Sequence, residues 1–163
     1  MSTASYDYTG LIIGYLSGSI DSWSTADGRM SFNGDTLYSY KSKLFQRIAP
    51  NTYVLDVAIS KYSVTTAKHT MRILRTMPSN TVIYRTCIDN DPISNVINYV
   101  SDIKYSISKF TRARSTKFQW QKHIHRTYAE LQSYIEFYKL DKRTTAYRQF
   151  KQLFAIMFEA KVL

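Results

Sequence analysis

The C-terminal half of the chain repeats its apolar residues with the period of an α-helix. The first repeat spaces them alternately by four and three residues, at Val96, Val100, Ile103, Ile107 and Phe110. This spacing brings apolar side chains to one side of a helix, where they pack against a neighbouring element. A second repeat covers roughly 115–139, with Trp120, Ile124, Tyr128, Leu131, Ile135 and Tyr138. A third has Tyr147, Phe150, Phe154 and Met157, with Leu153, Ile156 and Phe158 beside them. We therefore predict three C-terminal helices, the third more buried than the others.

A helix start precedes the first repeat. The Asp91 carboxylate can accept hydrogen bonds from the free amides of the first turn, and Pro92 suits a first helical position that needs no amide hydrogen. The sequence thus predicts Asp91 as the N-cap of the first C-terminal helix.

The pair Asn33-Gly34 predicts a β-hairpin over residues 29–40, because both residues accept the positive φ of a type I′ turn and strand-like residues flank them. A two-residue turn at this pair would place Phe32 opposite Asp35 and Met30 opposite Leu37. The core face would carry Met30, Phe32 and Leu37, and the other face Tyr38 and Tyr40.

Further strand signals follow. Residues 43–48 and 52–59, joined by a turn at 49–51, predict a second hairpin, and the β-branched run 80–88 predicts another strand. Short connections of this kind favour an antiparallel meander of about four strands. The apolar run at 11–16 predicts a loosely attached strand followed by a loop.

One helix is expected within this β-rich half. Residues 62–64 read as a strand end, and the helix would begin at Thr65 or Thr66, whose hydroxyl would cap it. Its apolar face would carry Ala67, Met71 and Leu74. The fold class is therefore α+β, with an N-terminal antiparallel β-meander containing one helix and a C-terminal half of about three helices. We divide it into a strand and loop segment (1–28), a β-rich subdomain (29–90) and a basic helical subdomain (91–163), forming one compact unit.

Charge is distributed unevenly along the chain. The formal net charge is +10, yet no basic residue precedes Arg29. Residues 103–151 contain twelve basic residues and three acidic ones, a net charge of +9. A concentrated excess of this size favours a polyanionic partner, either nucleic acid or an acidic protein surface.

The basic stretch interleaves cations with aromatic rings. Cations neutralise phosphates, and exposed rings stack on unpaired bases. The alternative is a solvated helix face, with Trp120 in the core. The candidate contacts are Lys104, Lys109, Arg112, Arg114, Lys117, Phe118, Lys122, His123, Arg126, Lys142, Arg143 and Arg148.

A second basic patch lies on the helix of the β-rich half. Lys68, Arg72 and Arg75 follow one another at four- and three-residue spacings and would share one helix face, with Lys61 just before the helix. Free amides at the helix start could hold an anion nearby. A solvated helix face explains the same pattern.

No catalytic or metal-binding motif stands out. His123 and His125 are separated by two positions on a predicted helix, so their side chains point about 200° apart and cannot coordinate the same metal ion. Asp89 and Asp91 are better explained as helix caps than as a two-metal site. A Gly-rich phosphate loop, a nucleophile elbow and a zinc-protease helix are all missing. We predict a non-enzymatic protein with no metal and no cofactor.

The single cysteine, Cys87, permits no internal disulfide and favours a reducing compartment. The polar N-terminus does not resemble a secretory signal, and no apolar run is long enough to cross a bilayer. We therefore expect a soluble intracellular protein with no membrane partner.

Part of the N-terminal half forms a recognisable pattern, which comprises FNGDTLYSY (32–40), Arg47 and YVLDVAISKYSVTTAKH (53–69). This pattern resembles the hairpin and the strand-to-helix junction of a family of small uncharacterised proteins of tailed bacteriophages; Lys41 stands where the family has Gly. The resemblance implies a phage-encoded protein acting in the host cytoplasm and transfers no activity.

These observations lead to one functional prediction with two alternatives. The leading prediction is a phage accessory protein that binds DNA or RNA through its basic helical surface, with an affinity that falls steeply with salt. The first alternative is an anti-CRISPR-like inhibitor that docks on a host defence complex or its nucleic-acid channel. The second is a structural protein of the virion.

Overall fold

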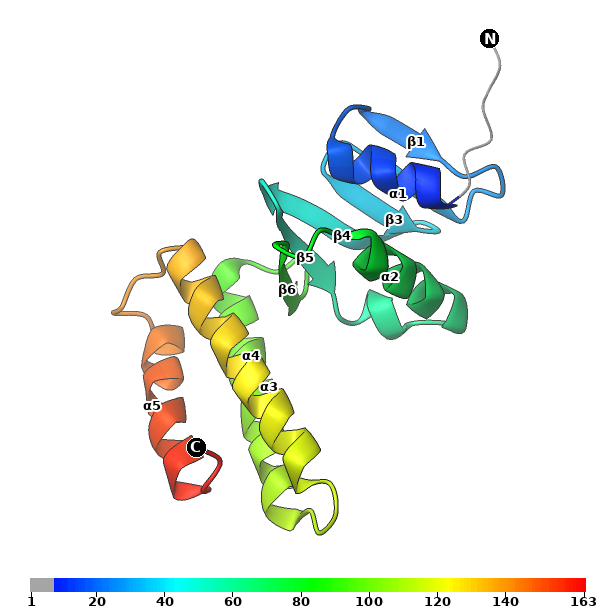
Figure 1. Cartoon of the computed structure of the whole chain (residues 1–163). Coiled ribbons are helices and arrows are strands. Elements are labelled where there is room, and N and C mark those ends of the chain that lie inside the picture. Colours follow the sequence, from blue (N-terminus) through cyan, green and yellow to red (C-terminus); the bar gives the residue numbers. More distant parts are fainter. Residues whose placement is uncertain (1–7) are drawn as a thin grey trace. The chain divides into compact units, whose positions relative to one another are not determined.

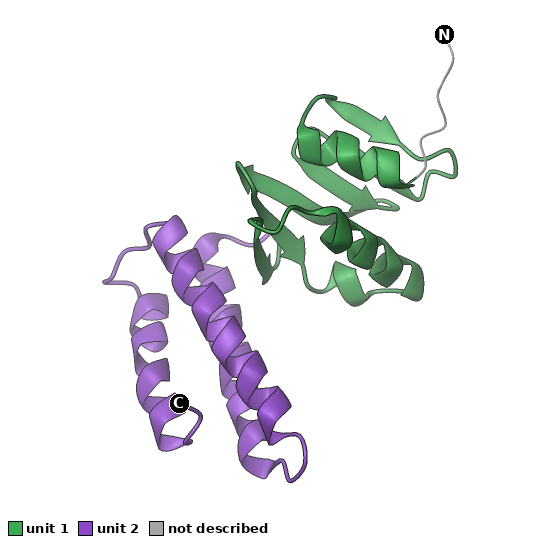
Figure 2. Ribbon diagram, viewed as in Figure 1, with its two compact units in different colours: residues 1–88 green, residues 89–163 purple. Residues whose placement is uncertain are grey.

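The computed structural model describes residues 8–163 and confirms the α+β class (Figure 1). A six-stranded sheet occupies the N-terminal half, and three helices occupy the C-terminal half. The chain divides into two compact units, unit 1 (residues 1–88) and unit 2 (residues 89–163) (Figure 2). In the part of the chain that the structure describes, the helices lack the combination of length and apolar character needed to span a bilayer.

The sheet of unit 1 follows the chain from one edge to the other. Its strands, in spatial as well as sequence order, are β1 (Ser22–Ser24), β2 (Met30–Asn33), β3 (Thr36–Ser39), β4 (Ser42–Ala49), β5 (Thr52–Asp56) and β6 (Val82–Thr86). Neighbours are antiparallel from β1 to β5, which confirms the meander predicted for β2 to β5; β1 lies where a loop was predicted. The prediction of a wholly antiparallel sheet is wrong for β6, which pairs with β5 in parallel. Parallel neighbours need a crossover, and α2 (Val64–Thr76) provides it.

The predicted β2–β3 hairpin forms with a different register. Asn33 pairs with Thr36 and Phe32 with Leu37, so the two loop residues are Gly34 and Asp35. Of these, only Gly34 has positive φ, which is the φ pattern of a type II′ turn and not of type I′. The register differs from the prediction by two residues, which preserves the side of the sheet. The predicted core residues Met30, Phe32 and Leu37 are accordingly all buried.

The predicted strand at 11–16 is wrong, because residues Tyr8–Ser17 form helix α1. The first seven residues of the predicted 1–28 segment lie outside the described residues. Leu11, Ile12 and Tyr15 are fully buried and join the sheet and α2 in one apolar core. A Cβ at Gly14 would make ordinary van der Waals contacts with Ile20 at 3.5 Å and Phe32 at 3.8 Å, so the packing of α1 on the sheet does not require glycine there. Helix α1 is therefore an integral part of unit 1.

The junction into α2 also differs from the prediction. A short 3₁₀ helix, η1 (Ile59–Lys61), precedes α2. The strand end predicted at 62–64 is wrong, because Val64 is the first residue of α2. The N-cap is Ser63, whose hydroxyl accepts from the Thr66 amide at 3.1 Å, so neither Thr65 nor Thr66 is the cap.

The predicted apolar face of α2 is only partly correct: Leu74 packs against the apolar core and Ala67 is half-buried, but the fully buried positions of the helix are mostly polar. Met71 is 49% exposed. The buried residues of α2 are Thr66, His69, Thr70 and Ile73.

Unit 2 consists of α3 (Pro92–Arg112), α4 (Lys117–Phe137) and α5 (Thr145–Glu159). The apolar stripe of α3 is buried as predicted, and Asp91 is the N-cap, accepting from the amides of Ile93 and Ser94. Helix α3 contacts both α4 and α5. The third helix is not more buried than the others, because Phe154 and Phe158 are 55% and 69% exposed. Leu153 and not Phe154 completes the buried stripe of α5.

Candidate nucleic-acid interface

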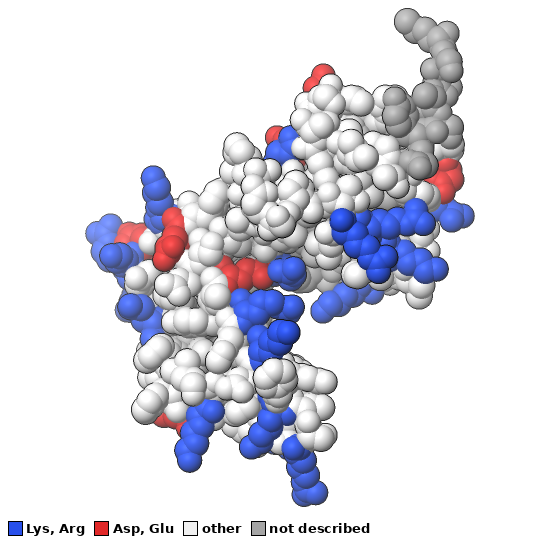
Figure 3. Space-filling model, viewed as in Figure 1, with Lys and Arg blue, Asp and Glu red and all other residues white. Residues whose placement is uncertain are grey.

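Five of the predicted contact residues lie together where α3 turns into α4. Arg112 is the last residue of α3, Arg114 lies in the connection, and Lys117 is the first residue of α4. Lys109 lies in the last turn of α3 and Phe118 in the first turn of α4. We call Lys109, Arg112, Arg114, Lys117 and Phe118 the turn cluster. Figure 3 shows Lys and Arg side chains projecting at this lower end of unit 2.

The local sequence explains why the chain turns here. The amide of Ala113 donates to the carbonyls of Lys109 and Phe110, which closes the last turn of α3. Helix α4 then begins without a side-chain cap, because the Thr116 hydroxyl accepts no amide hydrogen bond. The first amides of α4 therefore point into the connection and add partial positive charge to the turn cluster.

The positive charge of the turn cluster is not neutralised within the protein. The sequence has no acidic residue between Asp102 and Glu130. Among the described residues, Arg112, Arg114 and Lys117 form no ion pair. Cations in the last turn of α3 do stabilise its C-terminus, which accounts for Lys109 and Arg112 in part. It does not account for Arg114 or Lys117, which lie beyond that helix.

Exposed aromatic rings accompany these cations. Phe118 is 75% exposed and Tyr105, one turn before Lys109, is 56% exposed. The Lys109 Nζ lies 5.1 Å from the centre of the Tyr105 ring, and the Lys117 Nζ lies 5.6 Å from that of the buried Phe110. Trp120, by contrast, is half-buried and meets His123 edge-on. Phe118 and Tyr105 are thus the rings available to a ligand in this part of unit 2.

Three further predicted cations lie along the helices beyond the turn cluster. Lys104, Lys122 and Arg126 are exposed. His123 is already engaged, since its Nε2 lies 3.2 Å from Asp102 Oδ2 and its Nδ1 lies 3.2 Å from an Arg126 nitrogen. His125 points elsewhere, with its Nε2 2.8 Å from the Val162 carbonyl oxygen. The two histidines of α4 therefore have different partners: Asp102 of α3 and Arg126 for His123, and the Val162 carbonyl for His125.

The remaining predicted contacts lie at the opposite end of α4. Lys142 and Arg143 follow α4, and Arg148 lies in α5, so the length of α4 puts them roughly 30 Å from the turn cluster. Arg143 binds the Asp141 carboxylate, with its Nη2 at 2.9 Å, and Arg148 donates to the Arg143 carbonyl. The structure thus separates the predicted basic tract into two groups, of which this one is partly neutralised.

The second predicted patch lies on unit 1. Lys68, Arg72 and Arg75 are exposed on α2, as their spacing predicts, and Lys61 ends η1. Figure 3 shows Lys and Arg side chains gathered over α2. Arg72 is engaged with Tyr8, whose ring centre lies 4.8 Å from its guanidinium carbon.

The structure contains a buried polar cluster around His69 that the sequence analysis did not predict. His69 is 3% exposed, and its Nδ1 lies 2.9 Å from the Ser39 hydroxyl, which also bonds to Thr66. The rings of Tyr8 and Tyr40 lie 5.2 and 6.2 Å away. The sequence contains a signal for the burial of His69, because this residue and the other buried residues of α2 recur at the spacing of one helix face. The Ser39 hydroxyl is buried, so this pair cannot meet a substrate and acts in packing.

We predict that His69 makes unit 1 less stable in acid. Burial lowers the pKa of His69, and the neighbouring Arg72 lowers it further; Asp27 and Arg29 have smaller, opposed effects. An unfolded histidine titrates near 6.5, so below that pH the unfolded chain binds more protons than the folded one. The free energy of unfolding should therefore fall as the pH drops from about 7.5 to about 5.5.

Urea unfolding at several pH values, for the natural protein and a His69→Gln variant, measures this effect. The variant should lose part of the pH dependence. Asp27 does not interfere, because hydrogen bonds from Thr25 and Tyr8 lower its pKa to about 2 and place its titration below this range. Parallel pH profiles for the two proteins would contradict the prediction.

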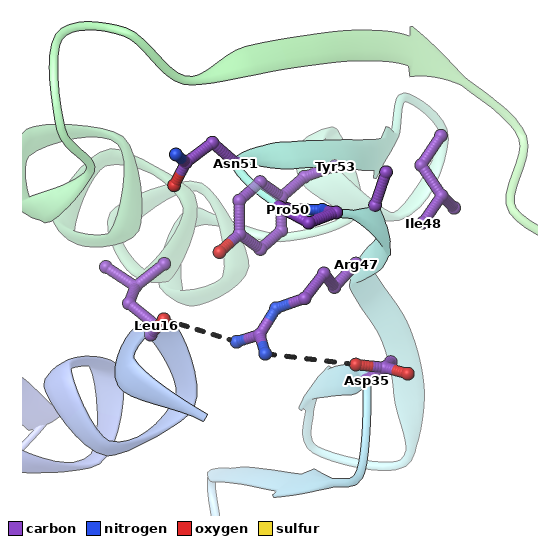
Figure 4. Close-up of a pocket in the computed structure, with 8 residues that line it drawn as sticks. Leu16, Asp35, Arg47, Ile48, Pro50, Asn51 and Tyr53 are labelled. Carbon is purple, nitrogen blue, oxygen red and sulfur yellow. Dashed lines mark hydrogen bonds and ion pairs between the residues drawn. The ribbon is translucent and has the colours of Figure 1, made fainter. Parts of the chain in front are cut away.

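A shallow pocket on unit 1 is explained by a structural arginine. It has a volume of about 460 Å³ and includes Arg47, Asp35 and Tyr53 in its lining (Figure 4). The Arg47 guanidinium donates to the carbonyls of Tyr15 and Leu16 at the end of α1, and lies 3.9 Å from Asp35. Arg47 therefore fastens α1 to the sheet, and the pocket is the space beside this contact.

Within residues 8–163, no group of three His, Cys, Asp or Glu side chains is arranged to hold a metal ion. Comparisons with protein-family models, with curated proteins and with solved structures gave no match to this chain.

Proposed function

We propose that the chain is a non-enzymatic protein that binds nucleic acid through the turn cluster. The observation that carries this proposal is the concentration of four cations at one helix turn, none of them with an ion-pair partner among the described residues, beside an exposed phenylalanine. Contacts between unpaired cations and phosphates favour binding, because they release the counterions condensed on the nucleic acid. On the resemblance of residues 32–69 alone, we further propose that the protein is encoded by a phage and acts in the host.

The geometry favours single strands over duplexes. The rings of Phe118 and Tyr105 are exposed next to the cations, and such rings stack on bases only when those bases are unpaired. The phosphates of a duplex can bind the cations, but its paired bases cannot stack on the rings. Each stacked ring should therefore strengthen binding to a single strand and leave binding to a duplex unchanged.

Equilibrium binding to labelled oligonucleotides tests the proposal. We expect single-stranded DNA or RNA to bind at low salt, with duplexes of the same sequence binding more weakly. Failure of all four probes, single- and double-stranded DNA and RNA, to bind at low salt would refute the proposed function.

Phe118→Ala separates stacking from charge. We expect it to weaken single-strand binding by about tenfold and to leave duplex binding and the salt dependence unchanged, since one base–ring stack contributes about 1–3 kcal/mol. Phe154→Ala provides a matched control, because it removes an exposed phenylalanine of unit 2 from a different helix. An equal loss of duplex binding would show that Phe118 acts through the fold of the turn.

A further inference from the structure

The outward face of α2 alternates apolar and basic side chains. Val64, Lys68, Met71 and Arg75 follow one another at four-, three- and four-residue spacings and therefore form one stripe along the helix. Val64 is 74% exposed and Met71 is 49% exposed. Tyr62, in the turn before the helix, is 83% exposed.

Helix α2 is unusual because several of its polar side chains face the protein interior and two of its apolar side chains face the solvent. Its inward face carries Thr66, His69 and Thr70, whereas Val64 and Met71 face the solvent. Folding of unit 1 does not account for the outward apolar residues, because they contribute little to its core. Clustered exposed apolar side chains commonly mark interaction sites. The stripe is therefore a candidate interaction surface.

We propose that this stripe docks an acidic segment of a partner protein. Charge complementarity identifies the segment as acidic: Lys61, Lys68 and Arg75 are exposed around the apolar residues, and the sequence has no acidic residue between Asp56 and Asp89. The partner segment would place Asp or Glu against these cations and apolar side chains against Val64, Met71 and Tyr62. The proposal does not rest on nucleic-acid binding by unit 2.

A protein fits this stripe better than a nucleic acid or a membrane does. Val64 and Met71 are aliphatic and cannot stack on bases, so a nucleic acid would leave them unused. Protein interfaces, by contrast, are enriched in Tyr, Met and Arg. A helix that binds a membrane surface needs a broad apolar face. Helix α2 lacks one on its outward side, because Ile73 is buried in the core.

Selection from a display library of short random peptides tests the proposal with the full-length protein as bait. We expect the bound peptides to be enriched in Asp and Glu together with Leu, Ile or Phe. Val64→Ser combined with Met71→Ser should weaken the binding of a selected peptide by about tenfold or more. Lys68→Gln combined with Arg75→Gln should remove the preference for acidic residues.

A matched control is Ile93→Ser combined with Ile97→Ser, which removes two aliphatic side chains of α3, each 42% exposed. This control should leave peptide binding unchanged, and all variants should keep the helical circular dichroism and melting temperature of the natural protein. Absence of acidic enrichment, or equal binding by the Val64/Met71 variant, would overturn the proposal. So would the finding that this variant loses binding to an oligonucleotide or to phosphatidylglycerol vesicles instead.

Discussion

Replacing Arg112, Arg114 and Lys117 together by alanine is expected to weaken single-strand binding about fiftyfold near physiological salt. Each phosphate contact to a single strand contributes about 0.7 to the slope of log K against log salt, so three lost contacts should also make that slope shallower by about 2. Fluorescence anisotropy over a salt series measures both quantities. Since the three side chains are exposed, the variant should fold like the natural protein.

The control for this experiment removes the same charge from the other end of α4. Lys142, Arg143 and Arg148 replaced together by alanine lower the net charge equally, but Arg143 is already bound to Asp141. We expect a change in affinity of less than about threefold, because surface charges this far apart are largely screened. Equal effects of the two triple variants would mean that net charge, and not the turn cluster, determines binding.

The largest loss of stability from one substitution outside the apolar core is expected for Asp56→Ala. The Asp56 side chain is 5% exposed at the end of β5. Its Oδ1 accepts from the amides of Ala58 and Ile59 at 3.0 and 2.9 Å, and its Oδ2 accepts from the Ile88 amide at 3.2 Å. Alanine would leave these three amides without that acceptor. We expect the free energy of unfolding to fall by about 3 kcal/mol or more.

Denaturant unfolding measures this loss. Asp56→Asn should be intermediate, because the amide oxygen can replace one carboxylate oxygen while the amide nitrogen cannot accept from Ile88. Asp21→Ala, an exposed aspartate of unit 1, should change the free energy of unfolding by no more than about 0.5 kcal/mol. A loss below about 1 kcal/mol for Asp56→Ala would contradict the role assigned to this carboxylate.

The helices of unit 2 could be predicted because their signal is local. An apolar stripe from Val96 to Phe110 specifies one buried helix side, and Asp91-Pro92 specifies where the helix begins. The outer positions of α5 were less predictable. Phe154 and Phe158 are as apolar as the buried Phe150, and only the packing of α5 against α3 distinguishes them.

Two features of unit 1 depend on contacts distant in the sequence. Residues 11–16 have the composition of a strand, but Arg47 binds the carbonyls at the end of α1 and the sheet buries Leu11, Ile12 and Tyr15, which stabilises a helix. The parallel direction of β6 could have been predicted, because a strand, a helix and a strand in succession form a crossover unit.

The sequence predicts which residues could form the candidate site, but it does not predict how they are arranged in space. The sequence identifies the cations of 104–148, and it identifies their concentration near the helix junction. It does not reveal that Arg143 pairs with Asp141 or that His123 bonds to Asp102, because such pairings depend on side-chain geometry. These contacts reduce the predicted surface to the turn cluster and its neighbours.

The most direct test of nucleic-acid binding by the turn cluster is the salt dependence of binding between the natural protein and a single-stranded oligonucleotide. Four cations in the turn cluster predict a slope of log K against log salt of about −3, measured between about 0.05 M and about 0.5 M salt. No binding at the lowest salt, or a slope near zero, would contradict the proposed function.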